Sequence, residues 1–367
     1  MPVKLRPRLY LRGMGSLTNS RLGSPVFTAE SMAQCSALLA APGTPLITAH
    51  RGPDGDAIGS ALALWNHLRE QGVDSRVVMP DHYPAFLHWL PGHAEVLLHE
   101  TDGERVAAAV AEANVIFCLD YNELSRTGSL APLLEASPAP KVMIDHHQHP
   151  ADFAAITWSD TARCSTAELV YGWIEARGEA DRISAATGAC LYTGIMTDSG
   201  SFRFPSVTPS THRIAARLIE AGVDHAVIHS RVYDTNQVHR MRLVGYALSE
   251  KLRVWPEYHT ALIALSQEEL RRFHYRSGDT EGLVNQALSI EGVNFAAFIH
   301  ESHDGRIKLS LRSRGAFSVR EVAAAHFNGG GHHNASGGAV DGATLEEVTA
   351  QFESLLPGVA EALAYQI

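Results

Sequence analysis

The chain has 367 residues, enough for two domains of ordinary size, and 45% of them are hydrophobic, enough for packed cores. Its formal net charge of -10 argues against a protein that binds long duplex nucleic acid over its whole surface, but a local site for a short anionic substrate remains open. No apolar run approaches the ~20 residues that cross a bilayer, so we expect no membrane partner. The four cysteines lack CxxC spacing, which is typical of a cytoplasmic protein without disulfides.

The N-terminal segment, residues 1–30, is basic and contains no acidic residue before Glu30. We expect it to form a disordered extension ahead of the folded chain. Two alternatives are an organellar transit peptide, which has a similar composition, and a later start at Met14 or Met32.

From about residue 45, short apolar runs alternate with helical patterns. We expect strands at residues 45–50, 75–80, 114–120 and 141–147. We expect helices at residues 56–72, 104–113, 130–136, 165–178, 183–198 and 208–223. Ser165 and Glu168 form the pattern of a capping box at the start of one of them. This alternation predicts an α/β domain with a parallel sheet and helices on both faces.

The pattern changes after about residue 235. Residues 235–255 are predicted to form one connecting helix. A strand at 259–266, a helix at 279–292, a hairpin at 293–315 and a closing helix at 345–364 are expected to follow. We therefore predict a first domain at 31–234, a helical linker at 235–255 and a smaller α/β domain at 256–367. The cleft between the domains is the expected substrate site.

Acidic and histidine residues gather at the ends of the expected elements. They are His50, Asp54 and Asp56 after the first strand, Asp120 at the end of the third, Asp145, His146 and His147 at the end of the fourth, and Asp198 at the end of helix 183–198. The carboxyl ends of parallel strands share one edge of a sheet, so these residues are expected to meet. Four carboxylates in one cleft would repel each other. Two divalent cations would remove that repulsion, and mixed imidazole and carboxylate ligands favour manganese.

Each of these residues also has a simpler interpretation when it is taken alone. Asp54 or Asp56 would serve as a helix cap, Asp120 as a turn residue, and His146 as a buried histidine with its hydrogen bonds satisfied. Capping explains one acid but hardly both acids together with His50. The gathering of all of them at one edge is what favours a metal site.

A glycine-rich run near the C-terminus has the composition of an anion-binding turn. The candidate substrate contacts here are Gly330, Gly331, His332 and His333, with Arg312 and Arg314 shortly before them. Arginine forks match phosphate oxygens well, although a flexible turn is the alternative for the glycine run. Arg203, just after Asp198, is a further candidate contact, with a surface salt bridge as its alternative.

Four segments, taken in order, resemble the motifs of the DHH phosphoesterase superfamily. They read HRGPDGDAIGS, CLDYN, IDHH and TDSGSFRF. The later LRSRG and NGGGHHNASGG resemble its DHH-associated C-terminal domain, and the similarity covers roughly residues 35–360. The first motif departs slightly, because Arg51 and Gly52 fill spacer positions. The most similar subfamily is that of the nanoRNases and pAp phosphatases.

The resemblance implies a role for each of these residues. His50 and Asp54 would hold one metal ion, Asp56, His146 and Asp198 the other, and Asp120 both. Asp145 would orient a histidine, and His147 would face the substrate phosphate. Arg314 and His332 occupy the positions that bind the nucleotide.

The implied function is metal-dependent phosphoester hydrolysis with two divalent ions. Manganese is expected, with magnesium or cobalt as alternatives. The expected substrates are oligoribonucleotides of two to five residues, cut to mononucleotides, and 3'-phosphoadenosine 5'-phosphate, cut to AMP. Alternatives are a phosphodiesterase for cyclic dinucleotides or their linear products, a pyrophosphatase or exopolyphosphatase, a long-strand exonuclease, and a non-catalytic nucleotide- or RNA-binding module. The family also suggests a homodimer.

Overall fold

The structure is a computed structural model that describes residues 26–276 and 278–364. Most of the expected extension, residues 1–25, lies outside the described residues. The extension was expected to include residues 29 and 30, but they are the first two of helix α1 (Ala29–Ala40). The Thr28 side chain accepts a hydrogen bond from the Ser31 amide, which caps this helix at its start.

The first domain contains six short strands and eight α-helices among the described residues. The strands are β1 (Leu46–Thr48), β2 (Arg76–Met79), β3 (Leu97–Leu98), β4 (Ile116–Leu119), β5 (Lys141–Asp145) and β6 (Ile156–Ser159). After α1, the helices are α2 (Gly55–Glu70), α3 (Gly103–Ala111), α4 (Ala131–Ala136), α5 (Thr166–Ala176), α6 (Ala185–Asp198), α7 (Pro209–Glu220) and α8 (His225–Tyr233). The sheet order is β3-β2-β1-β4-β5-β6, and every pairing is parallel, which confirms the predicted parallel sheet.

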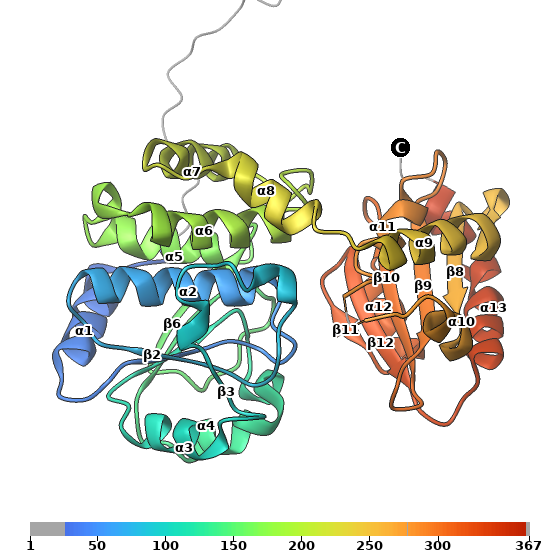
Figure 1. Cartoon of the computed structure of the whole chain (residues 1–367). Coiled ribbons are helices and arrows are strands. Elements are labelled where there is room, and N and C mark those ends of the chain that lie inside the picture. Colours follow the sequence, from blue (N-terminus) through green and yellow to red (C-terminus); the bar gives the residue numbers. More distant parts are fainter. Residues whose placement is uncertain (1–25, 277, 365–367) are drawn as a thin grey trace, which may run out of the picture.

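Helices cover both faces of this sheet (Figure 1). Helices α3 and α4 lie on one face, while α1, α2 and α5 lie on the other with α6, α7 and α8 stacked beyond them. Helix α2 is buried from Gly55 to Leu68, because it is enclosed between the sheet and the outer helices. Its nearly continuous apolar and small residues suit a helix that is covered all round.

The second domain is built on a mixed six-stranded sheet. Its strands are β7 (Leu252–Trp255), β8 (Thr260–Leu265), β9 (Phe295–Glu301), β10 (Ile307–Ser313), β11 (Gly330–Gly331) and β12 (Ala335–Val340). Its helices are α9 (Val238–Tyr246), α10 (Gln267–Arg272), α11 (Leu283–Leu288), α12 (Val319–His326) and α13 (Leu345–Ala364). The order is β11-β12-β10-β9-β8-β7, with α12 and α13 packed on one face and α9, α10 and α11 on the other.

The expected linker helix at 235–255 is only partly correct. Helix α9 ends at Tyr246, and a single wide turn (Ala247–Lys251) leads into strand β7. Residues Leu252–Trp255 pair with β8 as an edge strand, so the pairing overrides the helical pattern that precedes them. Leu243 of α9 is buried in the core of the second domain, so α9 is part of that domain. Within the described residues, no helix combines the length and apolarity needed to cross a bilayer.

Helices α2 and α6 approach each other closely at Gly59. A Cβ atom at Gly59 would lie 2.8 Å from the Cys190 carbonyl oxygen and 3.0 Å from the Gly194 amide nitrogen. Both are backbone atoms, so neither moves without shifting α6.

We therefore expect Gly59→Ala to lower the free energy of unfolding by about 1–3 kcal/mol, the usual effect of overpacking a core. Chemical denaturation monitored by circular dichroism measures the change. Gly358→Ala in α13 is the matched control, since nothing lies within 4 Å of its Cβ position. The control should be neutral or raise stability by about 0.5–1 kcal/mol, because alanine favours helix over glycine. If both substitutions changed the free energy of unfolding equally, the close approach of α2 and α6 at Gly59 would be contradicted.

Candidate active site and metal centre

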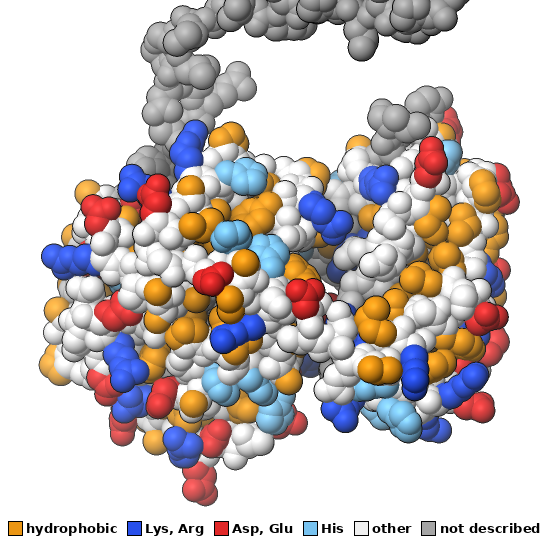
Figure 2. Space-filling view, turned by 45° about the horizontal axis from the view of Figure 1, so that its top comes forward, with side chains coloured by type: hydrophobic (Ala, Val, Ile, Leu, Met, Phe, Trp, Pro, Cys, Tyr) orange, Lys and Arg blue, Asp and Glu red, His pale blue; other side chains and the backbone are white. Residues whose placement is uncertain are grey.

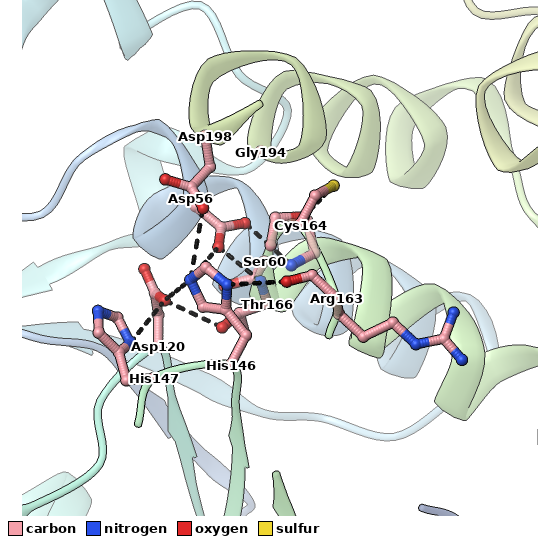
Figure 3. Close-up of polar contacts among 12 residues, drawn as sticks. Asp56, Ser60, Asp120, His146, His147, Arg163, Cys164, Thr166, Gly194 and Asp198 are labelled. Atoms are coloured by element: carbon pink, nitrogen blue, oxygen red, sulfur yellow. Dashed lines mark hydrogen bonds and ion pairs between the residues drawn. The ribbon is translucent and has the colours of Figure 1, made fainter. Parts of the chain in front are cut away.

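The predicted acids and histidines converge at the carboxyl edge of the parallel sheet (Figure 3). His50 follows β1, Asp120 follows β4, and Asp145 ends β5. Asp56 lies in the first turn of α2, and Asp198 is the last residue of α6. Residues separated by almost 150 positions therefore surround one small volume, as the strand-end pattern predicted.

Asp120 lies at the centre of this group. Its Oδ2 is 3.4 Å from His50 Nε2, and its Oδ1 is 3.5 Å from His146 Nε2 and 3.6 Å from His147 Nδ1. The residue has φ 62°, a left-handed conformation that aspartate tolerates better than most residues. This turn at the end of β4 directs the carboxylate into the site, where both of its oxygens face imidazoles.

Two groups of ligand atoms share the space around Asp120. His50, Asp54 and Asp120 form one group, and Asp56, His146 and Asp198 form the other. In the first, His50 Nε2 lies 3.9 Å from Asp54 Oδ1. Asp54 Oδ1 also accepts the amides of Asp56 and Ala57 as the N-cap of α2. Asp54 therefore caps helix α2, which was the alternative interpretation of this residue from the sequence. It also remains within the group of candidate metal ligands.

In the second group, His146 links two carboxylates. Its Nε2 lies 3.4 Å from Asp198 Oδ2 and 4.0 Å from Asp56 Oδ2. Its Nδ1 donates to the Arg163 carbonyl at 3.2 Å, and His50 Nδ1 donates in the same way to the Arg51 carbonyl at 2.9 Å. In both rings Nε2 therefore remains turned toward the acids. A backbone partner on one nitrogen with the other nitrogen free is the usual arrangement of a metal-binding histidine.

His147 lies beside these groups and is oriented by Asp145. Its Nδ1 donates to Asp145 Oδ1 at 2.8 Å, and Asp145 is fully buried. On its other side the ring stacks with His332 from the second domain, with 4.7 Å between centroids. Burial, together with nearby His147 and His146, lowers the pKa of His332 to about 3, so that its ring is neutral. The second domain thus closes one side of the site.

The N-terminus of α5 holds the acids in place, a feature that the sequence did not predict. The amides of Thr166 and Ala167 donate to the two oxygens of Asp56 at 2.6 and 2.9 Å, and the Thr166 hydroxyl donates to Asp120 Oδ1 at 2.9 Å. Helix N-termini favour anions, because their first amides are free and the helix dipole is positive there. The capping box predicted at Ser165 and Glu168 marked the start of this helix, and it was the signal in the sequence that could have pointed to these contacts. Ser165 does accept from the Glu168 amide, but the Glu168 carboxylate binds other partners.

Electrostatics in this site favour cations. Burial, and then the neighbouring carboxylates, raise the pKa of Asp56 and of Asp198 well above the ordinary range. Burial opposes protonation of His50, but the Asp120 and Asp54 carboxylates and the Arg51 carbonyl together outweigh it and raise the pKa of His50 to about 9. Burial also opposes ionisation of Asp120, and the three imidazoles outweigh it, so the pKa of Asp120 falls well below its usual value. Without metal, protons bound to these side chains offset part of the negative charge that divalent ions would neutralise. The carboxylate and imidazole donors of the site fit two such ions.

The candidate substrate contacts of the second domain separate into two sets. Arg312 faces the cleft, where burial lowers its pKa while Glu281 and Asp198 oppose that shift. Arg314 instead donates to the Leu288 carbonyl at 2.7 Å. His333 donates to the Ala316 carbonyl at 3.0 Å, whereas its neighbour His332 enters the site.

The remaining candidates lie on turns. Gly330 and Gly331 form β11 and are exposed. Gly331 has φ 137°, and a Cβ there would lie 2.7 Å from the Ala335 carbonyl oxygen, so glycine is needed for the turn that carries His332. Arg203 is exposed, and its Nε donates to the Gly200 carbonyl at 2.9 Å.

A hollow separates the two domains (Figure 2), and direct contacts cross it beside the site. Arg320 at the start of α12 donates to Gln148 at 2.8 Å, just after His147 in the chain. Glu281, from the loop before α11, has a pKa raised by burial and by the nearby Asp54 carboxylate. Both domains therefore contribute charged or polar groups to the same cleft.

Family models match both domains. One described as the DHH family, N-terminal domain, matches residues 45–195, and one described as the DHHA1 domain matches residues 261–357. The bifunctional oligoribonuclease and PAP phosphatase NrnA of Thermus thermophilus is 31% identical over 326 residues, which cover 89% of this chain and 92% of that protein. The protein of the same name from Bacillus subtilis is 27% identical and covers 81% of this chain and 89% of its own length.

Solved structures agree with these matches. An exopolyphosphatase-related protein from Bacteroides fragilis is 40% identical, with a TM-score of 0.89 that spans 93% of this chain and 99% of that one. RecJ from Thermus thermophilus, crystallised with Mn2+, is 13% identical with a TM-score of 0.51, over 92% of this chain and 56% of that one. The latter likeness shows a shared fold.

The Thr166 hydroxyl is expected to position Asp120 for metal binding. Thr166→Val keeps the side-chain shape and removes the hydroxyl, so we expect Mn2+ affinity to fall by about 10–100-fold, as for other partners of metal ligands. Calorimetric titration of the metal-free protein measures the affinity. Thr166→Ser retains the hydroxyl and should bind nearly as the wild type does. Wild-type affinity in the valine variant would exclude this role.

Protonation of His50 makes both stability and metal binding depend on pH. The folded-state pKa of about 9 lies above the unfolded value near 6.5, so His50 stabilises the metal-free protein fully below about pH 6.5. That contribution is lost as the pH rises through about 9. We expect the melting temperature in chelator to fall between these values, while Mn2+ affinity rises because fewer protons must leave. His50→Asn should flatten both profiles, and an unchanged slope in this variant would assign the effect to other groups.

Proposed function

The chain belongs to the DHH family of phosphoesterases, and we propose that its substrates are short oligoribonucleotides and 3'-phosphoadenosine 5'-phosphate. It is a metal-dependent hydrolase acting on phosphoester bonds. Oligoribonucleotides would be cut to mononucleotides, and the bisphosphate would be cut to AMP. The relatives named bifunctional oligoribonuclease and PAP phosphatase support both activities, since each match covers most of the relative's own length and of this chain.

One observation carries this proposal: carboxylate and imidazole ligands surround Asp120 on one side of a cleft, and the second domain places His332 against them from the other. A single domain with such a site would accept any phosphoester that reaches it. Contacts between the two domains beside the site restrict it to small substrates. The net charge of -10 further argues against binding long duplex nucleic acid.

Two divalent ions fit the donor set described above. In this proposal His50 and Asp54 hold one ion, Asp56, His146 and Asp198 hold the other, and Asp120 contacts both. When bound, such ions polarise the phosphoryl oxygens and lower the pKa of water that attacks phosphorus. We propose manganese, because imidazole and carboxylate ligands without thiolate suit it.

The protein groups around these ions would bind and orient the substrate. His147, held by Asp145, would face the phosphoryl group and stabilise its charge or supply a proton to the leaving oxygen. Arg312 and His332 would hold the remainder of the nucleotide, and the exposed amides of Gly330 and Gly331 would approach a phosphate. Arg203, Arg314 and His333 each donate to a backbone carbonyl, as one nitrogen of Arg312 also does, so each would exchange that bond for a contact with the substrate.

Further properties follow as part of the same proposal. The catalytic domain would extend from α1 to about residue 234, and the substrate-binding domain would include α9 and β7 together with residues 256–364. A cytoplasmic location fits the four cysteines, which are all buried and free. A homodimer would cover exposed apolar side chains near the junction of the domains, such as Val238 and Met241, which are 66% and 54% exposed.

Hydrolysis across a substrate panel tests the proposal. Purified protein with Mn2+ should release mononucleotides from a labelled dinucleotide and a five-mer, and AMP from the bisphosphate. Asp120→Asn should lower every rate by more than about 100-fold, above the effect of losing a partner of a metal ligand. Asp74→Asn, a change at an exposed acid paired with Arg76, is the matched control and should leave the rates unchanged.

The other outcomes of the panel identify different functions. Preference for a cyclic dinucleotide would indicate a cyclic-dinucleotide phosphodiesterase with the same metal centre. Binding of nucleotides without turnover of any of these substrates would indicate a non-catalytic module. Either result would replace the proposed function.

A further inference from the structure

The sheet of the second domain has one face that is only partly covered. Helices α9, α10 and α11 pack on β8 and β9, and their apolar contacts define the core on this side. The side chains that β10 directs to the same side are polar and belong to none of the hydrophobic cores: Lys308, Ser310 and Arg312. This part of the face continues from the substrate cleft along β10.

Strand register arranges this face in three rows, and the β9 members Ala296 and Phe298 lie in the core beneath the helices. Directly opposed residues of an antiparallel pair point to the same side. The rows, each written from β9 through β10 to β12, are Ala296, Arg312 and Ala335; Phe298, Ser310 and Gly337; His300, Lys308 and Ala339. The β12 member of every row is alanine or glycine, so a shallow track without bulky side chains runs beside the polar residues of β10.

The row nearest the metal centre is that of Arg312. Its guanidinium lies close enough to Asp198 and Glu281 for their charges to act on it. Lys308 lies four residues earlier on the same strand, which corresponds to about 14 Å along an extended chain. A nucleoside bisphosphate, with the length of one nucleotide between its phosphates, does not extend over that distance. A longer oligonucleotide anchored near Arg312 does.

Lys308 differs from the other lysines that the structure describes. The sequence has four lysines, and the first, Lys4, lies outside the described residues. Lys141 donates to the carbonyls of Ser137 and Ala139, and Lys251 pairs with Glu269 at 2.6 Å. Lys308 is exposed and, within the described part of the chain, its ammonium group makes no hydrogen bond or ion pair.

His300 lies directly opposite Lys308 on β9. His300 stacks on Phe298 with 5.0 Å between ring centroids and an interplanar angle of 11°, and its Nδ1 is buried without a hydrogen-bond partner among the described residues. Burial and the neighbouring Lys308 lower the pKa of His300 to about 4, so the imidazole is neutral. The ring is therefore packed against Phe298 with its Nδ1 enclosed, and it places no second positive charge beside the unpaired ammonium of Lys308.

We propose that Lys308, with Ser310 on the same face of β10, forms a distal subsite that binds a phosphate of oligoribonucleotides longer than two residues. This inference rests on the proposed function. Arg312 and the metal centre hold the end of the substrate that reacts, and Lys308 holds the following backbone across the track. The subsite lowers KM for longer substrates within the short range, and it makes no contact with dinucleotides or with 3'-phosphoadenosine 5'-phosphate.

Kinetics with substrates of different length test this subsite. For Lys308→Ala we expect KM for a five-mer to rise by about 2- to 5-fold, the size of one exposed ion pair, with kcat unchanged. The slope of log KM against log salt for the five-mer should become shallower by about 0.7, the value for one phosphate contact to a single strand. Kinetics with a dinucleotide and with the bisphosphate should match those of the wild type.

Two further variants test whether the effect of Lys308→Ala comes from this contact or from the loss of any positive charge. Lys308→Arg keeps a cation on the track and should retain the wild-type KM and salt slope. Lys251→Ala removes the same charge from a lysine that is already paired, so it should not alter the difference between long and short substrates.

Each outcome decides between the two proposals. A wild-type protein that degrades the five-mer, with Lys308→Ala indistinguishable from it in KM and salt slope, overturns the distal subsite and leaves the proposed function intact. An equal rise in KM for the bisphosphate and the five-mer also overturns it, because a distal contact cannot act on a substrate that does not reach it. A wild-type protein that degrades none of the substrates removes the proposed function, and the subsite with it.

Discussion

Mutual repulsion among buried carboxylates is the constraint on which the rest of this structure depends. Asp56, Asp120 and Asp198 lie close enough for their charges to act on one another, and burial alone already disfavours their charged forms. The surrounding protein supplies positive or donor groups from every side, including the amides at the start of α5 and the Nε2 atoms of His50 and His146. These partners lessen the repulsion without removing it, since the pKa values of Asp56 and Asp198 remain raised. The site is therefore built to be completed by cations.

Packing of the helices determines whether this arrangement can form. Asp198 reaches the site from α6, in the layer of helices beyond α2, so α2 and α6 must lie unusually close together. Gly59 and Gly194 permit that approach, and a Cβ at Gly194 would lie 2.8 Å from Asp56 Oδ1. Glycine within a helix costs about 0.5–1 kcal/mol relative to alanine. Stability and function are thus linked at this interface, because a side chain that separates the helices would also displace an acid from the site.

The sequence was sufficient to predict four of the six strands of the parallel sheet and the grouping of acids and histidines, because strand ends and helix ends can be located from short-range patterns. It did not predict the short edge strands β3 and β6. It was not sufficient for contacts that depend on how elements pack. The bond from Thr166 to Asp120 joins α5 to the end of β4 across 46 positions, and no local pattern records it. The same limit applies to Arg312 and Arg314, since the sequence alone suits either residue to bind phosphate. Arg314 follows the end of β10 and donates to the Leu288 carbonyl, a contact that the sequence does not predict. At 252–255, pairing with β8 overrode a helical pattern.

The contact between the domains bounds the space beside the candidate metal centre. An exposed pair of cations would act on any accessible phosphoester, so discrimination requires a second surface at a fixed distance. The turn at Gly330 and Gly331 supplies that surface, because its close backbone packing carries His332 onto the ring of His147. Arg320 and Gln148 join the domains next to this contact, where the chain leaves β5. The loop after β5 that carries His146 and His147 therefore also carries the domain contact, so movement of the second domain alters the space beside the site and the environment of His147 together.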